Sequence, residues 1–139
     1  MNEKLAALQG LLKTENLSGI VIEKQANFSW LTGGRGFIGL ASENACGCII
    51  VTATGAVVLS NNIESQRLAD EELTGLCSRD FLWYEESVRP GIVRELAGEN
   101  VMTDTQLASW FQAKRTTLDA TEQENYRFAG MHCAKIFLR

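Results

Sequence analysis

The chain has 139 residues, of which 45% are hydrophobic and 22% are charged, so it has the composition of a folded globular domain and not of a disordered chain. Its net charge of −4 disfavours nucleic acid as a partner, because proteins that bind nucleic acid usually carry a basic surface. No apolar stretch approaches the ~20 residues that span a bilayer, and no secretory signal is evident, so we expect no membrane partner and a cytoplasmic location.

The first part of the chain predicts a helix followed by a strand. Leucines recur at helical spacing within residues 2–15, which favours an amphipathic helix. A β-rich run at residues 20–22 then predicts a short buried strand. Residues 24–45 are rich in glycine, serine and asparagine, and we expect them to form mainly a loop.

The middle of the chain predicts an antiparallel hairpin. The β-rich runs 48–52 and 56–59 flank the connector at residues 53–55, whose Ala-Thr-Gly sequence suits a tight turn. Asn61 or Asn62 can then cap a helix, because an asparagine side chain accepts hydrogen bonds from the first free amides of a helix.

The second half of the chain alternates helices with strands. We expect the capped helix to end near Leu73 and a strand to follow at 81–84. A helix opened by Pro90 and ended by Gly98 then leads to a strand at 101–103. The last two elements are a helix from Leu107 to Leu118 and a helix opened by a Thr121–Glu124 capping box. This order predicts an α/β fold with a mixed β-sheet flanked by helices. The last helix reaches Arg139 without a stop signal, so we expect the chain to be cut within a longer protein.

The residues with metal-binding or acid–base chemistry form no recognisable constellation. The four cysteines and the single histidine lack the spacing of a zinc site, so we expect reduced structural thiols. A metal site, or a redox pair of Cys46 and Cys48, is the alternative. His132 is expected on a helix surface, with a general base as the alternative. Acidic residues such as Glu72 are interpreted as solvated surface.

Three glycines match a dinucleotide-binding pattern in spacing only. Gly34, Gly36 and Gly39 spell G-x-G-x-x-G, which binds a pyrophosphate when a strand directly precedes it and a long helix directly follows. Here the preceding strand ends well upstream, and the next strand begins too soon to leave room for that helix. The pattern therefore indicates a loop with unusual backbone angles, which carries Arg35 among its glycines.

Several short motifs resemble the N-terminal domain of the creatinase, prolidase and aminopeptidase P family, the M24 or "pita-bread" metallopeptidases. Residues 30–33, Trp-Leu-Thr-Gly, are similar to an aromatic-Leu-Thr-Gly signature of that domain. The block at residues 62–72 resembles a bacterial branch of Xaa-Pro peptidases. Glu124, Arg127 and Ala129 resemble the start of the first helix of the family's catalytic domain.

The resemblance implies a ribonuclease H-like α/β fold of the creatinase N-terminal type over residues 1–118. Residues 119–139 would then be a linker and the first helix of a missing catalytic domain. In this family that domain binds two divalent metal ions (Mn, Co or Zn) through two Asp, one His and two Glu, and the metals activate a water. This chain would then contain no catalytic residue, no metal ligand and no cofactor of its own, while the longer protein would be the enzyme.

The resemblance also implies partners and a site. The partners would be the C-terminal pita-bread domain, a second copy in a homodimer formed through residues 110–137, and a proline-containing peptide or related small substrate. Creatinase-like members cleave C–N bonds in non-peptide substrates, so the reaction class stays open. The residues expected to line the substrate are Asn27, Trp30, Arg35 and Phe37. Trp30 as a core residue, Arg35 as a solvated residue, and a stand-alone ligand- or protein-binding module are the alternatives.

Overall fold

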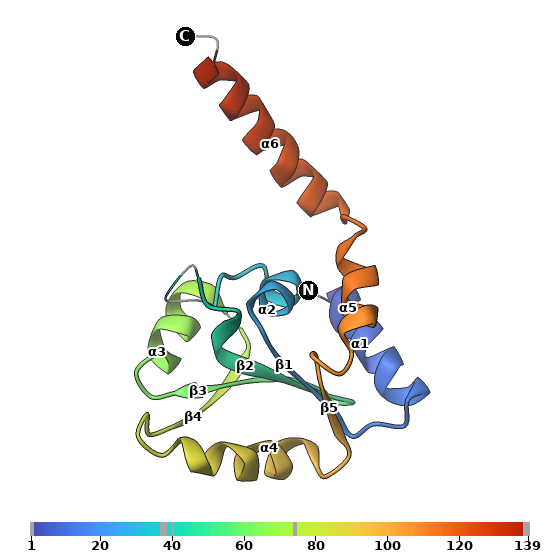
Figure 1. Ribbon diagram of the computed structural model, residues 1–139, viewed down its shortest axis with the longest axis vertical. Coiled ribbons are helices and arrows are strands. Elements are labelled where there is room, and N and C mark those ends of the chain that lie inside the picture. Colours follow the sequence, from blue (N-terminus) through green and yellow to red (C-terminus); the bar gives the residue numbers. More distant parts are fainter. Residues whose placement is uncertain (1, 37–38, 40, 74, 138–139) are drawn as a thin grey trace. The chain divides into compact units, whose positions relative to one another are not determined.

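The computed structural model describes residues 2–36, 39, 41–73 and 75–137, and the chain divides into two compact units, Met1–Ala108 and Ser109–Arg139 (Figure 1). The elements of the first unit are α1 (Asn2–Thr14), β1 (Gly19–Lys24), α2 (Gln25–Thr32), β2 (Asn44–Thr52), β3 (Gly55–Asn61), α3 (Ser65–Arg67), the π-helical turn η1 (Leu68–Glu72), β4 (Cys77–Phe81), the 3-10 turn η2 (Glu86–Val88), α4 (Arg89–Ala97) and β5 (Val101–Thr103).

The five strands form one mixed sheet in the order β4-β3-β2-β1-β5. The central pairs β1/β2 and β2/β3 are antiparallel, while β5 pairs with β1 and β4 pairs with β3 in parallel. The predicted hairpin is confirmed, because Thr52 pairs with Gly55 across a two-residue turn. The α/β fold class with a mixed sheet between helices is confirmed as well.

Helices cover the two faces of the sheet unequally (Figure 1). On one face α1 and α2 contact β1 and β2, and α3 contacts β3 and β4; on the other face α4 contacts β2. The pleat sorts the apolar residues of β1 between these faces, because neighbouring residues point to opposite sides. Ile20 and Ile22 therefore share one face, and Val21, which pairs with Ile50, lies on the face of α4.

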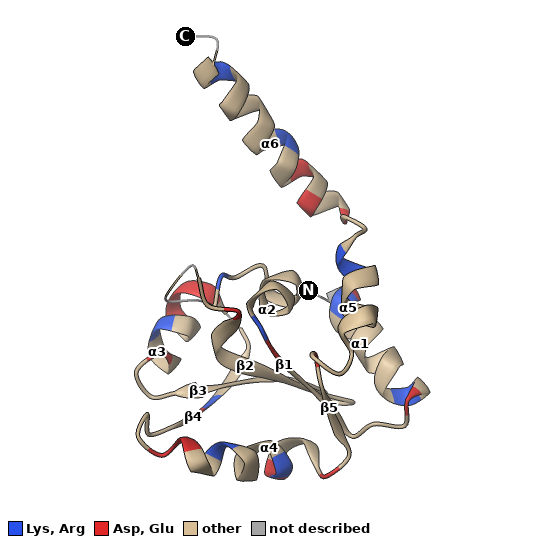
Figure 2. Cartoon of the chain, in the orientation of Figure 1, with Lys and Arg blue, Asp and Glu red and all other residues tan. Residues whose placement is uncertain are grey.

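The face covered by α4 holds its own apolar cluster. The cluster consists of buried residues from three strands and α4, with partly buried residues packed against it: Val21, Cys48, Ile50, Leu59 and Ala97, then Phe81, Ile92, Val93, Leu96 and Val101. Pro90 opens α4 as predicted, and Gly98 ends it with φ 79°. The charged residues of α4 are Arg89, Arg94 and Glu95, whereas the charged residues of η1 are all acidic (Figure 2).

The prediction of a loop over residues 24–45 is wrong in its first part, because Gln25–Thr32 is the helix α2. Phe28 and Leu31 lie three residues apart on this helix and are both buried, so packing on the sheet stabilises it. No side chain caps the N-terminus of α2, so the sequence contains no capping residue that would have predicted where this helix begins. Gly33 ends it in the left-handed conformation.

The predicted strand at residues 81–84 is also misplaced, because β4 covers Cys77–Phe81. The Phe81 carbonyl accepts a hydrogen bond from the Asn62 amide at 2.8 Å, and the chain then turns away from the sheet. Trp83 and Tyr84 remain 59% and 64% exposed. Aromatic composition suggested a strand here, whereas parallel pairing with β3 selects the more polar segment before it.

The predicted helix after β3 is confirmed, but its predicted cap is not. The Asn61 side-chain oxygen accepts the amides of Ile63 and Glu64, both at 3.1 Å, so Asn61 stabilises the turn that leads into the helix. The N-cap residue of α3 itself is Glu64, and no side chain caps it, so the prediction of Asn61 or Asn62 as the cap is wrong by two residues or more. The helix that follows is short and continues as the π-helical turn η1 up to Glu72, where the Leu73 amide donates to the Leu68 carbonyl.

The second unit is helical. The elements from residue 108 onward are α5 (Ala108–Arg115) and α6 (Ala120–Phe137), which confirms both predicted helices. The capping box of α6 is formed by Asp119 and Glu122, whose side chains each accept the other's amide at 2.8 Å. The predicted box, Thr121–Glu124, is therefore wrong by two residues; aspartate is an equally good cap, and it comes first along the chain.

All four cysteines are free thiols; Cys48 is buried and Cys46 half-buried, whereas Cys77 and Cys133 are exposed. Within the described ranges, no helix is both long enough and apolar enough to cross a membrane. The predicted boundary between residues 118 and 119 stays a prediction.

Two glycines offer a matched test of the packing of the first unit. A Cβ on Gly19 would lie 2.6 Å from the Ala97 Cβ, whereas a Cβ on Gly10 of α1 would meet nothing within 4 Å. We expect Gly19→Ala to lower the free energy of unfolding by about 1–3 kcal/mol through overpacking. Gly10→Ala should raise it by about 0.5–1 kcal/mol, because alanine favours a helix. Urea unfolding followed by circular dichroism measures both, and equal effects of the two substitutions would contradict this packing.

Candidate functional site

The most structured polar feature of the first unit surrounds the glycine loop, residues 33–36. The loop begins where Gly33 takes φ 77° and donates its amide to the Ser29 carbonyl at 2.8 Å. The Thr32 hydroxyl then accepts the Gly34 amide at 3.0 Å. These contacts turn the chain sharply away from α2 and place Arg35 at the exposed side of the turn.

Two of these glycines are required by close packing. A Cβ on Gly34 would lie 3.0 Å from the Glu72 carbonyl oxygen, and a Cβ on Gly36, where φ is 59°, would lie 2.5 Å from the ring of Phe28. A helix precedes the glycines and strand β2 follows them, so among the described residues no helix begins where a bound pyrophosphate would need one. Glycine serves here to let the loop lie against η1 and α2.

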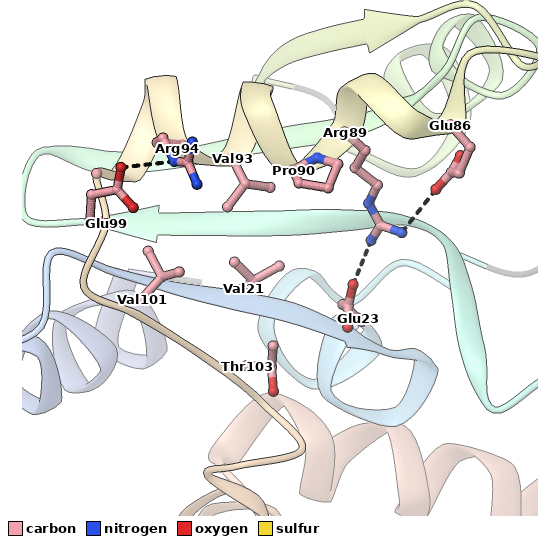
Figure 3. A pocket seen from close by; sticks show the side chains of 11 residues that line it. Val21, Glu23, Glu86, Arg89, Pro90, Val93, Arg94, Glu99, Val101 and Thr103 are labelled. Carbon is pink, nitrogen blue, oxygen red and sulfur yellow. Dashed lines mark hydrogen bonds and ion pairs between the residues drawn. The ribbon is translucent and has the colours of Figure 1, made fainter.

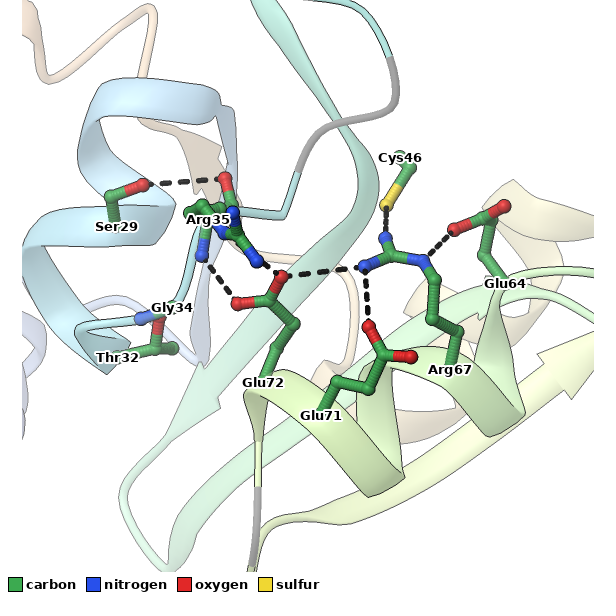
Figure 4. A network of polar contacts seen from close by, with 9 residues as sticks. All are labelled: Ser29, Thr32, Gly34, Arg35, Cys46, Glu64, Arg67, Glu71 and Glu72. Carbon is green, nitrogen blue, oxygen red and sulfur yellow. Dashed lines mark hydrogen bonds and ion pairs between the residues drawn. The ribbon is translucent and has the colours of Figure 1, made fainter.

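The carboxylate of Glu72 holds the glycine loop (Figure 4). One oxygen accepts the Arg35 amide at 2.8 Å, and the other accepts an Arg67 guanidinium N–H at 3.3 Å and lies 3.6 Å from the Arg35 Nε. The Glu72 side chain is only 7% exposed, so the interpretation of this residue as solvated surface is wrong. A buried carboxylate is tolerated because two guanidinium groups and an amide surround it.

Arg67 is the centre of the same network. Its Nε donates to Glu64 at 2.8 Å, and a terminal nitrogen donates to the Cys46 sulfur at 3.4 Å. A second terminal nitrogen reaches Glu72 and lies 3.9 Å from Glu71. The hydrogen bond to Glu64 raises the pKa of the Arg67 guanidinium. Arg67 thus joins β2, α3 and η1 through one permanently charged group (Figure 4).

The two cysteines of β2 are not thiolates at neutral pH. Burial, reinforced by the nearby Glu64 carboxylate, raises the pKa of the Cys46 thiol. Burial also raises the pKa of Cys48, which lies in the apolar cluster under α4. A nucleophilic cysteine needs a lowered pKa, so both thiols act as packing groups.

Comparison with known proteins identifies the family. The sequence profile of the Creatinase/Prolidase N-terminal domain matches residues 4–126, which is most of the chain. The chain belongs to this family. Comparison with curated proteins finds no match. The family membership confirms the resemblance that the Trp-Leu-Thr-Gly signature indicated.

Solved structures of creatinase/prolidase relatives share the fold. The prolidase of Pyrococcus horikoshii OT3 is 14% identical, with a TM-score of 0.60 over 88% of this chain and 37% of that chain. The dipeptidase PepE of Mycobacterium ulcerans is 16% identical, with a TM-score of 0.61 over 88% of this chain and 38% of that chain. The N-terminal domain of an X-Pro dipeptidase from Streptococcus pyogenes is 12% identical, with a TM-score of 0.54 over 78% of this chain and 98% of that chain. At these identities the likeness concerns the fold.

The structure separates the four residues predicted to line a substrate. Asn27 is buried and donates to Asp104 at 2.8 Å. Trp30 is half-buried, and the Lys4 ammonium lies 5.4 Å from its ring centroid. Arg35 is the exposed member of the set, with 74% of its side chain accessible. Phe37 lies outside the described residues. Contact with a substrate stays a prediction for all four.

Asp104, which directly follows β5, is a buried structural residue. One carboxylate oxygen accepts the Lys24 amide and the Asn27 side-chain amide, both at 2.8 Å, and the Asp104 amide donates to Val21 at 2.9 Å. These bonds tie the end of β5 to the end of β1 and the start of α2. The other Asp104 oxygen and the Asn27 side-chain oxygen have no hydrogen-bond partner. No spacing in the sequence signals this contact, because its partners lie about eighty residues apart.

Within the described ranges, no group of three or more His, Cys, Asp or Glu side chains could hold a metal ion. His132 lies exposed on α6, with its ring 4.0 Å from that of Phe128 and its Nδ1 2.9 Å from the Phe128 carbonyl oxygen. The site around the glycine loop presents the exposed cation of Arg35 on the turn formed by residues 33–36. It offers no ligand set for a metal among the described residues.

The role of Asp104 can be tested by two substitutions that differ in what they leave behind. Asp104→Ala leaves the Lys24 amide and the Asn27 amide group buried without an acceptor, and we expect it to cost about 2–4 kcal/mol of unfolding free energy. Asp104→Asn keeps an oxygen for both donors, and its new amide replaces an oxygen that has no partner, so its cost should stay below about 1 kcal/mol. Urea unfolding of both variants decides the point. Equal losses would mean that Asp104 does not act as an acceptor.

Proposed function

We propose that this chain is the non-catalytic N-terminal domain of a metal-dependent Xaa-Pro peptidase or prolidase-like hydrolase, in which it shapes substrate access and supports a homodimer. The family membership supports the proposal, and so do relatives described as prolidase and X-Pro dipeptidase. The chain spans 37% of the length of the P. horikoshii prolidase, so the catalytic chemistry is assigned to a C-terminal pita-bread domain.

The observation that carries the proposed role in substrate access is the fixed position of Arg35. Its amide and its Nε face the buried Glu72 carboxylate, while its two terminal guanidinium nitrogens have no partner among the described residues. An arginine whose backbone is anchored and whose side chain is 74% exposed is suited to donate two parallel hydrogen bonds to a carboxylate. The substrate group that we assign to it is the carboxylate of a proline-containing peptide or a related small substrate.

The proposed metal chemistry lies outside this chain. The described residues do not fit a metal site, because the carboxylates and the Cys46 thiol around Arg67 are already bound to guanidinium groups. The two divalent ions, Mn, Co or Zn, are therefore assigned to the C-terminal domain, where they would activate a water. The role that we assign to this chain is to position the substrate and to restrict access to the active site. Four unpaired thiols support a cytoplasmic location.

Exposed apolar side chains support the proposed homodimer. In the first unit, Ile63, Trp83 and Tyr84 are 61%, 59% and 64% exposed. In the second unit, α6 exposes large apolar side chains at Tyr126, Phe128, Met131, Ile136 and Phe137. Apolar patches of this kind mark surfaces that another chain or domain covers. We assign the interface to residues 110–137, which include the exposed apolar residues of α6.

The test begins with the reading frame beyond Arg139 and continues with the longer protein that it encodes. We expect the frame to contain two Asp, one His and two Glu as metal ligands, and the metal-loaded protein to hydrolyse an Xaa-Pro dipeptide. Arg35→Ala should then lower kcat/KM by about 10- to 100-fold, the loss expected for one charge-assisted hydrogen-bonding group. The matched control is Arg79→Ala, which removes an exposed arginine of β4.

The outcomes separate the parts of the proposal. A frame without the metal-ligand set would contradict the hydrolase assignment and favour a stand-alone ligand- or protein-binding module. An active enzyme in which Arg35→Ala equals Arg79→Ala would contradict only the role of Arg35. A strictly monomeric longer protein in sedimentation would contradict the homodimer.

A further inference from the structure

A groove runs along the sheet face beside α4, away from the glycine loop (Figure 3). It has a volume of about 470 Å³ and is formed by α4, β1, β5 and the residues just before and after α4. The groove exists because α4 packs against β2 and leaves the β1 and β5 part of this face open. Its volume falls within the range of roughly 300–1,000 Å³ that is typical of small-molecule sites.

The floor of the groove is apolar. Val21 and Val101 come from neighbouring strands, and Val93 and Pro90 face them from α4 (Figure 3). Burial of an apolar group against these side chains would remove hydrophobic surface from water, which is favourable in proportion to the area covered.

The two ends of the groove carry unequal charge. At one end Arg89 donates to Glu23 at 2.7 Å and to Glu86 at 3.2 Å, so two carboxylates share one guanidinium (Figure 3). At the other end Arg94 and Glu99 form a neutral pair at 2.8 Å. Three acidic and two basic residues line the groove, which leaves one negative charge in excess. That charge lies where the Glu23 and Arg89 side chains are only 33% and 29% exposed, so solvent screens it less than an open surface charge.

We propose that this groove binds a small ligand that carries one positive charge on an apolar body, such as a primary amine with an aromatic or branched aliphatic group. The ammonium lies against Glu23 and Glu86, where a donor completes the hydrogen bonding of the two carboxylates. The apolar body covers Pro90, Val93 and Val101 above the buried Val21. The same charge balance disfavours an anionic ligand. The inference rests on the groove alone and is independent of the proposed hydrolase function.

The probes are 2-phenylethylamine and its uncharged analogue 2-phenylethanol, titrated into the 139-residue chain and followed by protein NMR. We expect the amine to shift the methyl signals of Val21, Val93 and Val101 and to bind about fivefold more tightly than the alcohol at low salt. Added salt should narrow this difference, because ions screen the attraction. Equal affinity for the two probes, or shifts confined to residues outside the groove, would overturn the proposal.

Three variants change the charge of the groove or leave it unchanged. Glu23→Gln removes the excess negative charge and should weaken binding of the amine by about fivefold. Arg94→Gln removes a positive charge from a side chain that is 67% exposed, and should strengthen binding by about twofold or more. Glu95→Gln changes an exposed residue of α4 that does not line the groove, and it should leave binding unchanged.

Glu23→Gln and Arg94→Gln should change the affinity for the amine in opposite directions, so the test stays decisive even if one variant folds poorly. The NMR spectrum of each variant reports whether the sheet is intact, and Arg94→Gln alters only the exposed end of the groove. If Arg94→Gln and Glu95→Gln bind the amine equally, the excess charge does not select the ligand and the proposal fails.

Discussion

The buried carboxylate of Glu72 accepts the amide of Arg35 at 2.8 Å and a guanidinium N–H of Arg67 at 3.3 Å. The glycine loop, η1 and β2 meet through this one side chain and through the guanidinium of Arg67. An unpaired carboxylate at this depth would be costly, so the network is stable only as a set. The set fixes where Arg35 lies, and the position of Arg35 is the basis of the proposed role in substrate access.

Close packing accounts for two of the three glycines in a pattern that resembles a nucleotide-binding turn. A Cβ on Gly34 would be tight against the Glu72 carbonyl and one on Gly36 would clash with the ring of Phe28, whereas one on Gly39 would meet nothing within 4 Å. Both contacts are properties of this fold and require no phosphate. A short glycine spacing can thus arise from close packing, and only the neighbouring elements distinguish the two causes.

Local sequence signals predicted the elements that depend on local contacts. The β2-β3 hairpin, the α4 helix with its Pro90 and Gly98, and the Asn61 turn each have their determinants within a few residues. Helix α2 was not predicted, because its stability comes from burial of Phe28 and Leu31 on a sheet that forms elsewhere in the chain.

The parts of the molecule that depend on distant contacts could not be predicted. Strand β4 is defined by parallel pairing with β3 and not by its own composition. Asp104 and Glu72 resemble surface acids in the sequence, and only their distant partners Asn27 and Arg35 reveal their burial. The expectation that the loop lies near a substrate came from the family resemblance and not from periodicity, and it stays a prediction.

The central claim is that Glu72 fixes the glycine loop, and hydrogen exchange at the Arg35 amide measures this most directly. In Glu72→Ala the Arg35 amide should exchange at least about tenfold faster than in the parent chain, because it loses its acceptor. In Glu71→Ala, which removes an exposed neighbour 3.9 Å from Arg67, exchange at Arg35 should not change. Amides of β2 should keep their protection in both variants, which shows that the sheet stays folded. Equal exchange at Arg35 in the two variants would contradict the account.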